Sequence, residues 1–543
     1  MIKKHGLWFA IQYYLVIPFF LLAVGLLAAR KPLFLFLCNY LKLIPESSFY
    51  HTFQLVLPMV LFVFWFSIVF TICRNKKYTY KTGRSFPKDH GKYKRSYAEL
   101  LEYFQDAEPH KLDTSDFKKM NWRAAKGIVF GASNGKLIQI PTASECNIAV
   151  FGPPGSGKSA GLAIINAITF QGSVLAVDIK GDLYSYVCKH TDRKIVRFCP
   201  DSPTALQDSV RFDPFSDLTN MDITDQKLYL ESMATVLIAD EGESANNYFS
   251  TRGRKLFQGI THLILYTNPQ ASFPDVIHAI LQGNVFDWVT KAIDSNCEPA
   301  KELLSSFYGN NEKNVSSAYD ALTTALVHFS NPVLDVLLSK SKHSLSLQTL
   351  ENGFDVYLQI SQEHLEAYAP LFTLLIQTLS TACTKRPDSS TGIKNRPIPI
   401  LMLLDEFPQL TFSYQLINTN LSTLRSKSVI CMLLQQNLSQ LEYRFQQTGA
   451  RSILGNCNYQ IILGSNDINS SKTFSDTFGI KKVLKISNSE TTSKNDSTGR
   501  SIQEATEKVF PPEYFGDLPA QNKMIIYFKG KYLECNKLNC YKD

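Results

Sequence analysis

Two long apolar runs lie near the start of the chain. Residues Leu7 to Ala29 and Leu55 to Cys73 contain no charged side chain, and each is close to the roughly 20 apolar residues that a helix needs to cross a bilayer. The first run exceeds the apolar segment of about 7 to 15 residues in a cleaved signal peptide. A second run also follows it closely. The pattern therefore predicts a transmembrane hairpin rather than a signal peptide.

Basic residues flank these runs unequally. Residues 30–52 contain three, Arg30, Lys31 and Lys42, whereas residues 74–95 contain nine against the single acid Asp89. Because Lys and Arg concentrate on the cytoplasmic side of membrane spans, the C-terminal portion is expected in the cytoplasm, with a multi-pass anchor in the membrane. The basic run after Cys73 is interpreted as a topology signal and lipid-headgroup contact in preference to a nucleic-acid site.

Beyond the hairpin, short apolar strands alternate with helical segments, except between residues 222 and 343, where the pattern is helical throughout. This predicts the α/β class, with a nucleotide-binding domain interrupted by an all-helical insert. The expected divisions are 1–75 for the transmembrane anchor, 76–215 for the first part of the nucleotide-binding domain, 216–345 for the insert and 346–543 for the second part. Residues 487–499 are polar and predict a solvated loop or mobile hairpin.

A glycine-rich segment lies between a predicted strand, Asn147 to Phe151, and a predicted helix, Ser159 to Phe170. It matches the phosphate-binding pattern GxxxxGK[ST], and we expect its backbone to hold ATP. Its eight residues are Gly152, Pro153, Pro154, Gly155, Ser156, Gly157, Lys158 and Ser159. In that pattern the lysine reaches the β and γ phosphate oxygens and the serine hydroxyl binds Mg²⁺.

Two acidic residues end another apolar strand, Pro399 to Asp405, and provide the second half of a nucleotide site. Asp405 is expected to contact Mg²⁺, and Glu406 to orient or deprotonate the attacking water. A buried strand that merely ends in solvated acids is the alternative, and the nearby phosphate loop makes it less favoured. A further strand, Ser428 to Leu434, is followed by Gln435 and Gln436, which either sense the γ-phosphate or belong to an ordinary loop.

Composition narrows the class of protein. With 543 residues and 45% hydrophobic content, the chain is not a disordered or fibrous protein. Its eleven cysteines are scattered singly, which argues against a zinc site and against a disulfide framework. The net charge of +8 permits an anionic partner without requiring one.

The order of these features resembles the TraG/TraD-like coupling proteins of type IV secretion and conjugation, over nearly the whole chain. The matching segments, besides the hairpin and the phosphate loop, are Lys126-Gly-Ile-Val-Phe-Gly131, Asp178-Ile-Lys-Gly-Asp182-Leu, Arg211-Phe-Asp-Pro214, Phe354-Asp-Val-Tyr-Leu, Leu404-Asp-Glu-Phe, Leu434-Gln-Gln with Ser439-Gln-Leu441, and Ile462-Leu-Gly-Ser-Asn466-Asp467.

This resemblance implies a RecA-like motor domain, a homo-hexameric ring at the bacterial inner membrane and ATP turnover with Mg²⁺. The partners that it implies are single-stranded DNA bound by a relaxase, protein effectors, or both, together with components of the secretion channel. Arg425 lies where the family has the arginine that reaches a neighbouring subunit's γ-phosphate, although a surface salt bridge or a helix-end role stays open. Gln435 matches the family's sensing glutamine.

Two other functions share the same nucleotide motif. A membrane docking receptor would bind ATP as an assembly switch, but Glu406 favours turnover because binding alone does not need a positioned acid. A double-stranded DNA pump of the FtsK kind would carry a long linker and a C-terminal DNA-reading module, and neither is evident in the sequence.

Overall fold

The structure is a computed structural model that describes residues 125–541, with short gaps at 134–135, 240–245, 342, 390–396, 492–496 and 529, and also residues 31, 32 and 35. The expected transmembrane hairpin and basic run lie outside the described residues. Among those residues, no helix combines the length and the apolar character that a bilayer crossing requires.

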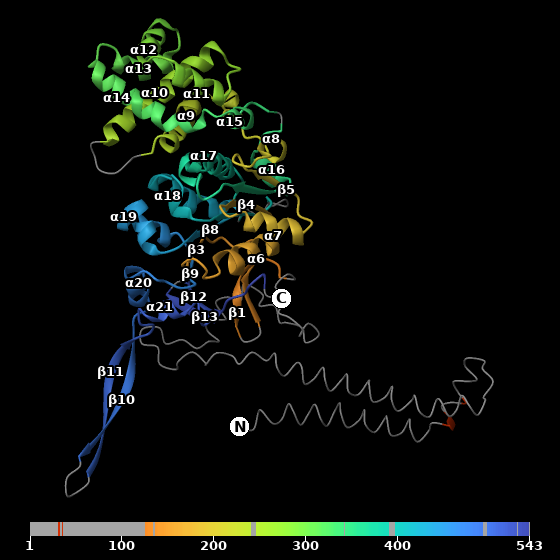
Figure 1. Cartoon of the computed structure of the whole chain (residues 1–543), viewed down its shortest axis with the longest axis vertical. Helices are drawn as coiled ribbons and strands as arrows, with labels where there is room; N and C mark the ends of the chain where they lie inside the picture. The colour runs from red at the N-terminus through yellow and green to blue at the C-terminus, as the bar shows by residue number, and fades with distance from the viewer. Residues whose placement is uncertain are drawn as a thin grey trace. The chain divides into compact units, whose positions relative to one another are not determined.

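One mixed sheet forms the centre of the described chain (Figure 1), with strand order β2-β1-β13-β12-β9-β3-β8-β7-β4-β6-β5. Seven neighbouring strands are parallel: β9 (Tyr459–Ile462), β3 (Ile148–Phe151), β8 (Val429–Gln435), β7 (Ile400–Leu404), β4 (Ser173–Asp178), β6 (Asp355–Gln359) and β5 (Ile195–Phe198). Because parallel strands end at one edge, the loops that follow β3, β4, β6, β7 and β8 gather there.

The remaining four strands extend the sheet beyond β9, and each is antiparallel to the strands beside it. They are β12 (Lys523–Phe528), β13 (Lys531–Asn536), β1 (Ile128–Ser133) and β2 (Lys136–Ile140). The expected α/β class and the strands predicted at β3, β7 and β8 are confirmed, whereas β1, β2, β5 and β13 were not predicted.

Helices cover both faces of the sheet, because alternate strand residues are apolar on each side. On one face, Ile148 and Val150 pack with α6 (Ile164–Thr169) and α7 (Asp182–His190). On the other, Ala149 and Phe151 pack with α17 (Leu365–Thr384), α18 (Tyr414–Thr423), α19 (Leu438–Gly455), α20 (Ile468–Phe478) and α21 (Tyr514–Asp517). The central strands are buried on both faces, as their continuous apolar sequences require.

Between β5 and β6 the chain is mainly helical, and the helices within residues 223–326 make the group at one end of Figure 1. The α-helices between β5 and β6 are α8 (Ala205–Asp208), α9 (Ile223–Leu237), α10 (Asn246–Thr267), α11 (Phe273–Gln282), α12 (Val285–Asp294), α13 (Glu298–Leu304), α14 (Glu312–Leu326), α15 (Pro332–Leu337) and α16 (Leu347–Glu351). Polar caps set several starts; Ser272, for example, accepts a hydrogen bond from the Asp275 N–H in a complete capping box. The apolar core of these helices is continuous with one face of the sheet.

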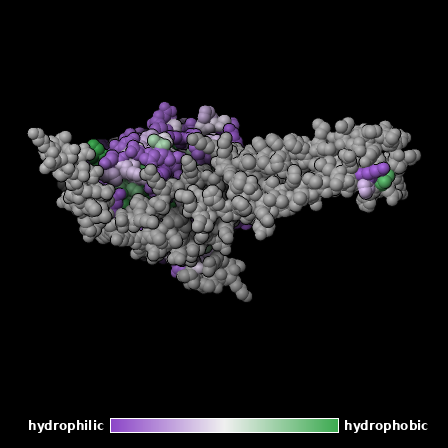
Figure 2. Space-filling view, turned by 90° about the horizontal axis from the view of Figure 1, so that it is seen from below, coloured by the Kyte–Doolittle hydropathy of each residue, from purple (hydrophilic) through white to green (hydrophobic). Residues whose placement is uncertain are grey.

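Strands β10 (Ile480–Thr491) and β11 (Ser497–Lys508) pair only with each other, in a separate two-stranded sheet. The described residues of the polar segment 487–499 lie in these two paired strands, which agrees with the hairpin alternative from the sequence. On the face shown in Figure 2, the described surface is mainly hydrophilic.

Candidate nucleotide site

The glycine-rich loop follows β3 at the sheet edge where the parallel strands end. The Gly152 N–H donates to the Gln435 carbonyl at 3.1 Å, and the Ser156 N–H donates to the Pro153 carbonyl at 3.1 Å. Gly155 and Gly157 have φ of +76° and +96°, which side-chain-bearing residues rarely adopt. The loop therefore has backbone conformations at these two positions that glycine adopts without steric strain.

Lys158 is buried beneath this loop, and its Nζ donates to the Gly152 carbonyl oxygen at 2.6 Å. Burial lowers the pKa of Lys158, while Glu406 and Asp405 act in the opposite direction. The positive charge of Lys158 therefore interacts with the negative charges of Glu406 and Asp405. The two halves of the motif meet at one place, as the sequence predicted for strands that end at one edge.

Asp405 and Glu406 follow β7 directly. Burial raises the pKa of Asp405 to about 6, and the negative charge of Glu406 adds to that rise. Glu406 is buried and has φ of +46°, in the left-handed region, where a non-glycine residue is strained. Its N–H donates to Asp405 Oδ1 at 3.0 Å. The backbone thus turns sharply to place two neighbouring carboxylates at one site.

The Glu406 carboxylate accepts hydrogen bonds from two glutamine side chains. Gln436, which follows β8, donates to both carboxylate oxygens, and Gln409 donates to Oε2 at 3.4 Å. Gln409 belongs to a 3₁₀ turn, η8 (Phe407–Gln409), immediately after Glu406. These amides fix the orientation of the carboxylate that the sequence assigned to the attacking water.

Gln435 and Gln436 have different surroundings because β8 runs one residue beyond its predicted end. Gln435 is opposite Phe151 in the parallel ladder, and its fully buried side-chain amide has no hydrogen-bond partner in the described structure. Gln436 is the glutamine whose side chain contacts Glu406. The geometry thus places Gln436 at the Glu406 carboxylate, and Gln435 within the sheet beside the phosphate loop.

Arg425 lies at the other end of the same strand. It belongs to η9 (Leu424–Lys427), which precedes β8, and its charge acts on the buried thiols of Cys146 and Cys457. At about 3.3 Å per residue, a strand of this length separates its ends by roughly 20 Å. Arg425 is therefore not brought together with Lys158 of its own chain.

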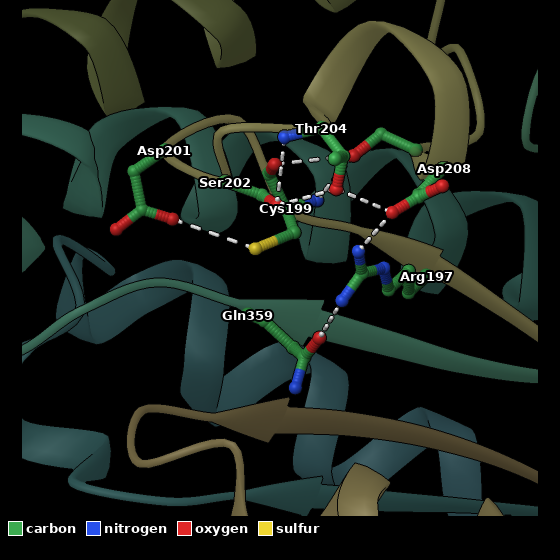
Figure 3. Close-up of polar contacts among 8 residues, drawn as sticks. Arg197, Cys199, Asp201, Ser202, Thr204, Asp208 and Gln359 are labelled. Atoms are coloured by element: carbon green, nitrogen blue, oxygen red, sulfur yellow. Dashed lines mark hydrogen bonds and ion pairs between the residues drawn. The ribbon is translucent and has the colours of Figure 1, made fainter.

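A series of hydrogen-bonded polar side chains extends from the site along the ends of β4, β6 and β5. Gln359 donates to Asp178 Oδ2 at 3.3 Å and accepts from Arg197 Nη1 at 3.5 Å, and Arg197 Nη2 in turn donates to Asp208 Oδ2 at 2.6 Å. Figure 3 shows Gln359 below Arg197, with Cys199, Asp201, Ser202 and Thr204 around the loop after β5. Sequence reasoning missed Gln359, although a polar residue ending an apolar strand was the available signal.

Asp178 and Lys180 connect this chain to the phosphate loop. Asp178 raises the pKa of Asp405, and the positive charge of Lys180 lowers the pKa of Lys158. Burial raises the pKa of Asp178 itself, while the N–H groups of Tyr184 and Leu183 oppose the rise by donating to its carboxylate. The segment after β4, one of those that carry the family resemblance, thus borders the site.

The residues present fit a nucleoside phosphate with Mg²⁺. A Cβ added at Gly155 or Gly157 would meet open space, and the buried Ser156 hydroxyl oxygen has no hydrogen-bond partner in the described structure. The nearby acids, Asp405 and Glu406, offer the oxygen ligands that Mg²⁺ prefers.

Comparison with known proteins agrees with this geometry. The model of the family described as type IV secretory system conjugative DNA transfer matches residues 110–543. The chain belongs to this family. It is 23% identical over 425 residues to protein VirD4 of Rhizobium rhizogenes, covering 77% of this chain and 62% of that protein. It is 21% identical over 439 residues to the conjugal transfer protein TraG of Escherichia coli, covering 73% of this chain and 67% of TraG.

Solved structures of the coupling protein TrwB share the fold. An unbound form has a TM-score of 0.59 at 17% identity, covering 76% of this chain and 88% of that one. A TrwB complex with the ATP analogue ADPNP has a TM-score of 0.57 at 15% identity, covering 77% of this chain and 91% of that one. Another TrwB structure contains ADP and Mg²⁺. The type IV coupling protein family and a TrwB-like α/β fold with a mixed sheet, which fits a RecA-like NTPase, are thereby confirmed.

Proposed function

We propose that this type IV coupling protein hydrolyses ATP, and that turnover delivers substrates to a secretion channel. The observation that carries the proposal is the meeting of Lys158, Asp405 and Glu406 at one sheet edge, buried and electrostatically coupled. The complexes of TrwB with an ATP analogue and with ADP and Mg²⁺ support the choice of nucleotide and metal.

Each residue has a role that its position supports. The backbone of Gly152 to Ser159, including Pro153 and Pro154, holds the phosphates, and Lys158 leaves the Gly152 carbonyl to bind their oxygens. Ser159 and Asp405 hold Mg²⁺, which supplies positive charge against the phosphate oxygens. Glu406, oriented by Gln436 and Gln409, positions the attacking water and accepts its proton.

The assembly that we propose is a homo-hexamer in which Arg425 acts on the neighbouring subunit. Its distance from Lys158 along β8 supports action in trans, because it is too far to act in cis. The family relationship supports an inner-membrane location, a channel partner, and single-stranded DNA with a relaxase, protein effectors, or both as substrates. The chain spans 62% of the length of the VirD4 relative, and these whole-protein properties are part of the proposal.

The test is ATP turnover by the purified full chain with Mg²⁺, with and without single-stranded DNA. We expect DNA-stimulated turnover, loss of nucleotide binding in Lys158→Ala, and retained binding without turnover in Glu406→Gln. Lys189→Ala and Glu363→Gln are matched controls, because both side chains are exposed and lie outside the site. A folded wild-type chain that binds ATP but turns none over, even with DNA and secretion partners, would favour the docking receptor instead.

A further inference from the structure

The segment that follows β13 packs directly on the phosphate loop and on the first turns of the helix after it. The Cys540 N–H donates to the Ala160 carbonyl at 3.0 Å, and the Tyr186 hydroxyl donates to the Cys540 carbonyl at 2.7 Å. A Cβ at Gly161 would lie 2.9 Å from the Leu538 carbonyl oxygen, so this glycine permits the close approach. Residues 537–540 therefore lie against the proposed nucleotide site.

Lys537 is the charged residue of this segment, and its ammonium group points at the loop. Its Nζ donates to the Ser156 carbonyl at 3.0 Å and to the Leu463 carbonyl, at the end of β9, at 3.5 Å. The backbone of Lys537 is fixed in turn, because its N–H donates to the Asn522 carbonyl at 3.0 Å and its carbonyl accepts from Asn522 Nδ2 at 3.3 Å. The side chain is thus held at the back of the loop.

Among the residues that the structure describes, no carboxylate forms an ion pair with Lys537. The residue is 8% exposed, and burial lowers its pKa to about 8. The charged residues on the adjoining segments include Lys158 of the phosphate loop, Asp467 after β9, Lys523 of β12, and Lys531 and Glu534 of β13. Lys523 pairs with Glu534, and Asp467 bonds Ser439 and Ser470. A buried ammonium without an anion is costly, so an anionic ligand bound nearby would be favoured.

The hydrogen bond from Lys537 to the Ser156 carbonyl also orients the N–H of the next residue, Gly157. The Ser156 carbonyl and the Gly157 N–H belong to one trans peptide unit, in which the two groups point in opposite directions. By holding the carbonyl, Lys537 turns the Gly157 N–H toward the other side of the loop. Gly157 N–H is one of the backbone donors that the phosphate-binding pattern uses.

We propose that Lys537 is a positioning residue of the nucleotide site, which aims the Gly157 N–H at the phosphates of a nucleoside di- or triphosphate and adds a positive charge behind the loop. This inference rests on the proposed function, since it needs the loop to bind nucleotide. Lys537 touches backbone and not the reacting atoms. It therefore acts through the loop.

The test compares binding of ADP with Mg²⁺ by the full chain in the wild type, Lys537→Met, Lys537→Arg and the control Lys523→Met, which removes a partly buried lysine from the same β-hairpin. We expect affinity about tenfold weaker in Lys537→Met, at the low end for a hydrogen bond to a charged group, partial recovery in Lys537→Arg and no change in the control. The rise in unfolding temperature caused by ADP should shrink in Lys537→Met relative to its own nucleotide-free form.

The pH dependence of ADP binding gives a second test. The ADP affinity of the wild type should fall as the pH rises from 7 through about 8 to 9.5, as Lys537 loses its proton, and this step should be absent in Lys537→Met. A merely structural role would lower the unfolding temperature with and without ADP alike and leave the step in place. If the wild type binds ADP and Lys537→Met binds it equally well, the inference is overturned and the proposed function stands; if the folded wild type binds no ADP, the proposed function itself fails.

Discussion

Gln436 donates its side-chain amide to both carboxylate oxygens of Glu406, at 3.1 Å to Oε1 and 3.3 Å to Oε2. The Gln436 amide thus contacts the carboxylate from one side. The backbone of Glu406 itself is strained, with φ of +46°. Strain of this kind persists where surrounding contacts determine the position of a side chain. The pair fixes the acid that would orient water, and it joins the ends of β7 and β8.

Replacement of Gln436 by Leu should lower the kcat for ATP without a comparable change in KM. The amide contacts the acid and not the phosphate loop, so binding of nucleotide is preserved while the orientation of Glu406 is lost. We expect a loss of about 10- to 100-fold, the range usual for partners that orient a functional group. Steady-state kinetics of the full chain with Mg²⁺ measure both constants.

Gln348→Leu is the control for this change, because Gln348 is exposed and its side chain bonds only the neighbouring Asn352 in the described structure. Gln409→Leu should give a smaller loss than Gln436→Leu, since Gln409 makes a single hydrogen bond to Glu406 and that bond is longer, at 3.4 Å. A Gln436→Leu enzyme with wild-type kcat would show that Glu406 needs no such support.

Arg425 should act only on a neighbouring subunit, which a mixing experiment can detect. Arg425→Ala and Lys158→Ala chains should each be inactive alone. In mixed oligomers, a Lys158→Ala subunit supplies its intact arginine to the intact site of an Arg425→Ala subunit, so part of the ATPase activity should return. Turnover is measured against the ratio of the two chains.

Lys427→Ala is the matched control for Arg425, because it lies in the same 3₁₀ turn and pairs with Asp388 at 3.0 Å. It should keep its activity unmixed. Failure of the mixed chains to regain any turnover, with oligomers shown to form, would assign Arg425 to a structural role near Cys146 and Cys457.

The residues that the sequence could predict are those whose chemistry is local. Lys158 and Glu406 each lie in a short motif beside an apolar strand, and strands buried on both faces are recognisable as continuous apolar runs. The ends of strands are harder to predict than their centres. Because side chains alternate between the two faces of a strand, a shift of one residue in the end of β8 determines which of Gln435 and Gln436 contacts Glu406.

The residues that could not be predicted depend on contacts between distant parts of the chain. Lys537 and Ser156 are 381 positions apart, and nothing in the sequence around Lys537 indicates that the last strands return to the phosphate loop. Gln359 and Asp178 are 181 positions apart, across the helical segment. Strand β1 pairs with β13, which comes from the other end of the chain, and β2 pairs with β1, so the residues around these strands do not indicate where they join the sheet.

A buried ion pair between Arg193 and Asp355 should be essential to the stability of the sheet edge. Arg193 Nη2 donates to Asp355 Oδ1 at 2.7 Å, its Nε donates to Oδ2, and the carboxylate has no exposed surface. Asp355→Leu alone should lower the free energy of unfolding by about 3–5 kcal/mol, because it leaves the positive charge of Arg193 without its anionic partner. The double variant Arg193→Met/Asp355→Leu should be more stable than Asp355→Leu in urea unfolding, and a double variant that is weaker still would contradict this.

His262 should make the helical segment sensitive to acid. It lies in α10, is 5% exposed and lines a cavity of about 560 Å³, and its Nε2 has no hydrogen-bond partner in the described structure. Burial, with a smaller contribution from the charge of Lys227, lowers its pKa to about 4. The unfolded chain, with a usual histidine pKa near 6.5, therefore binds more protons between pH 6.5 and 4.

The stability that His262 contributes is thus complete above pH 6.5 and is lost as the pH falls toward 4, by on the order of 3 kcal/mol. His262→Gln should remove this loss, so that the difference in unfolding free energy between variant and wild type changes in favour of the variant from pH 7.5 to 4.5 in urea titrations. Other titrating groups cancel in that difference. His328→Gln, at an exposed histidine of the same helical segment, should follow the wild type at both pH values. An equal pH dependence of His262→Gln and wild type would show that folding does not lower the pKa of His262.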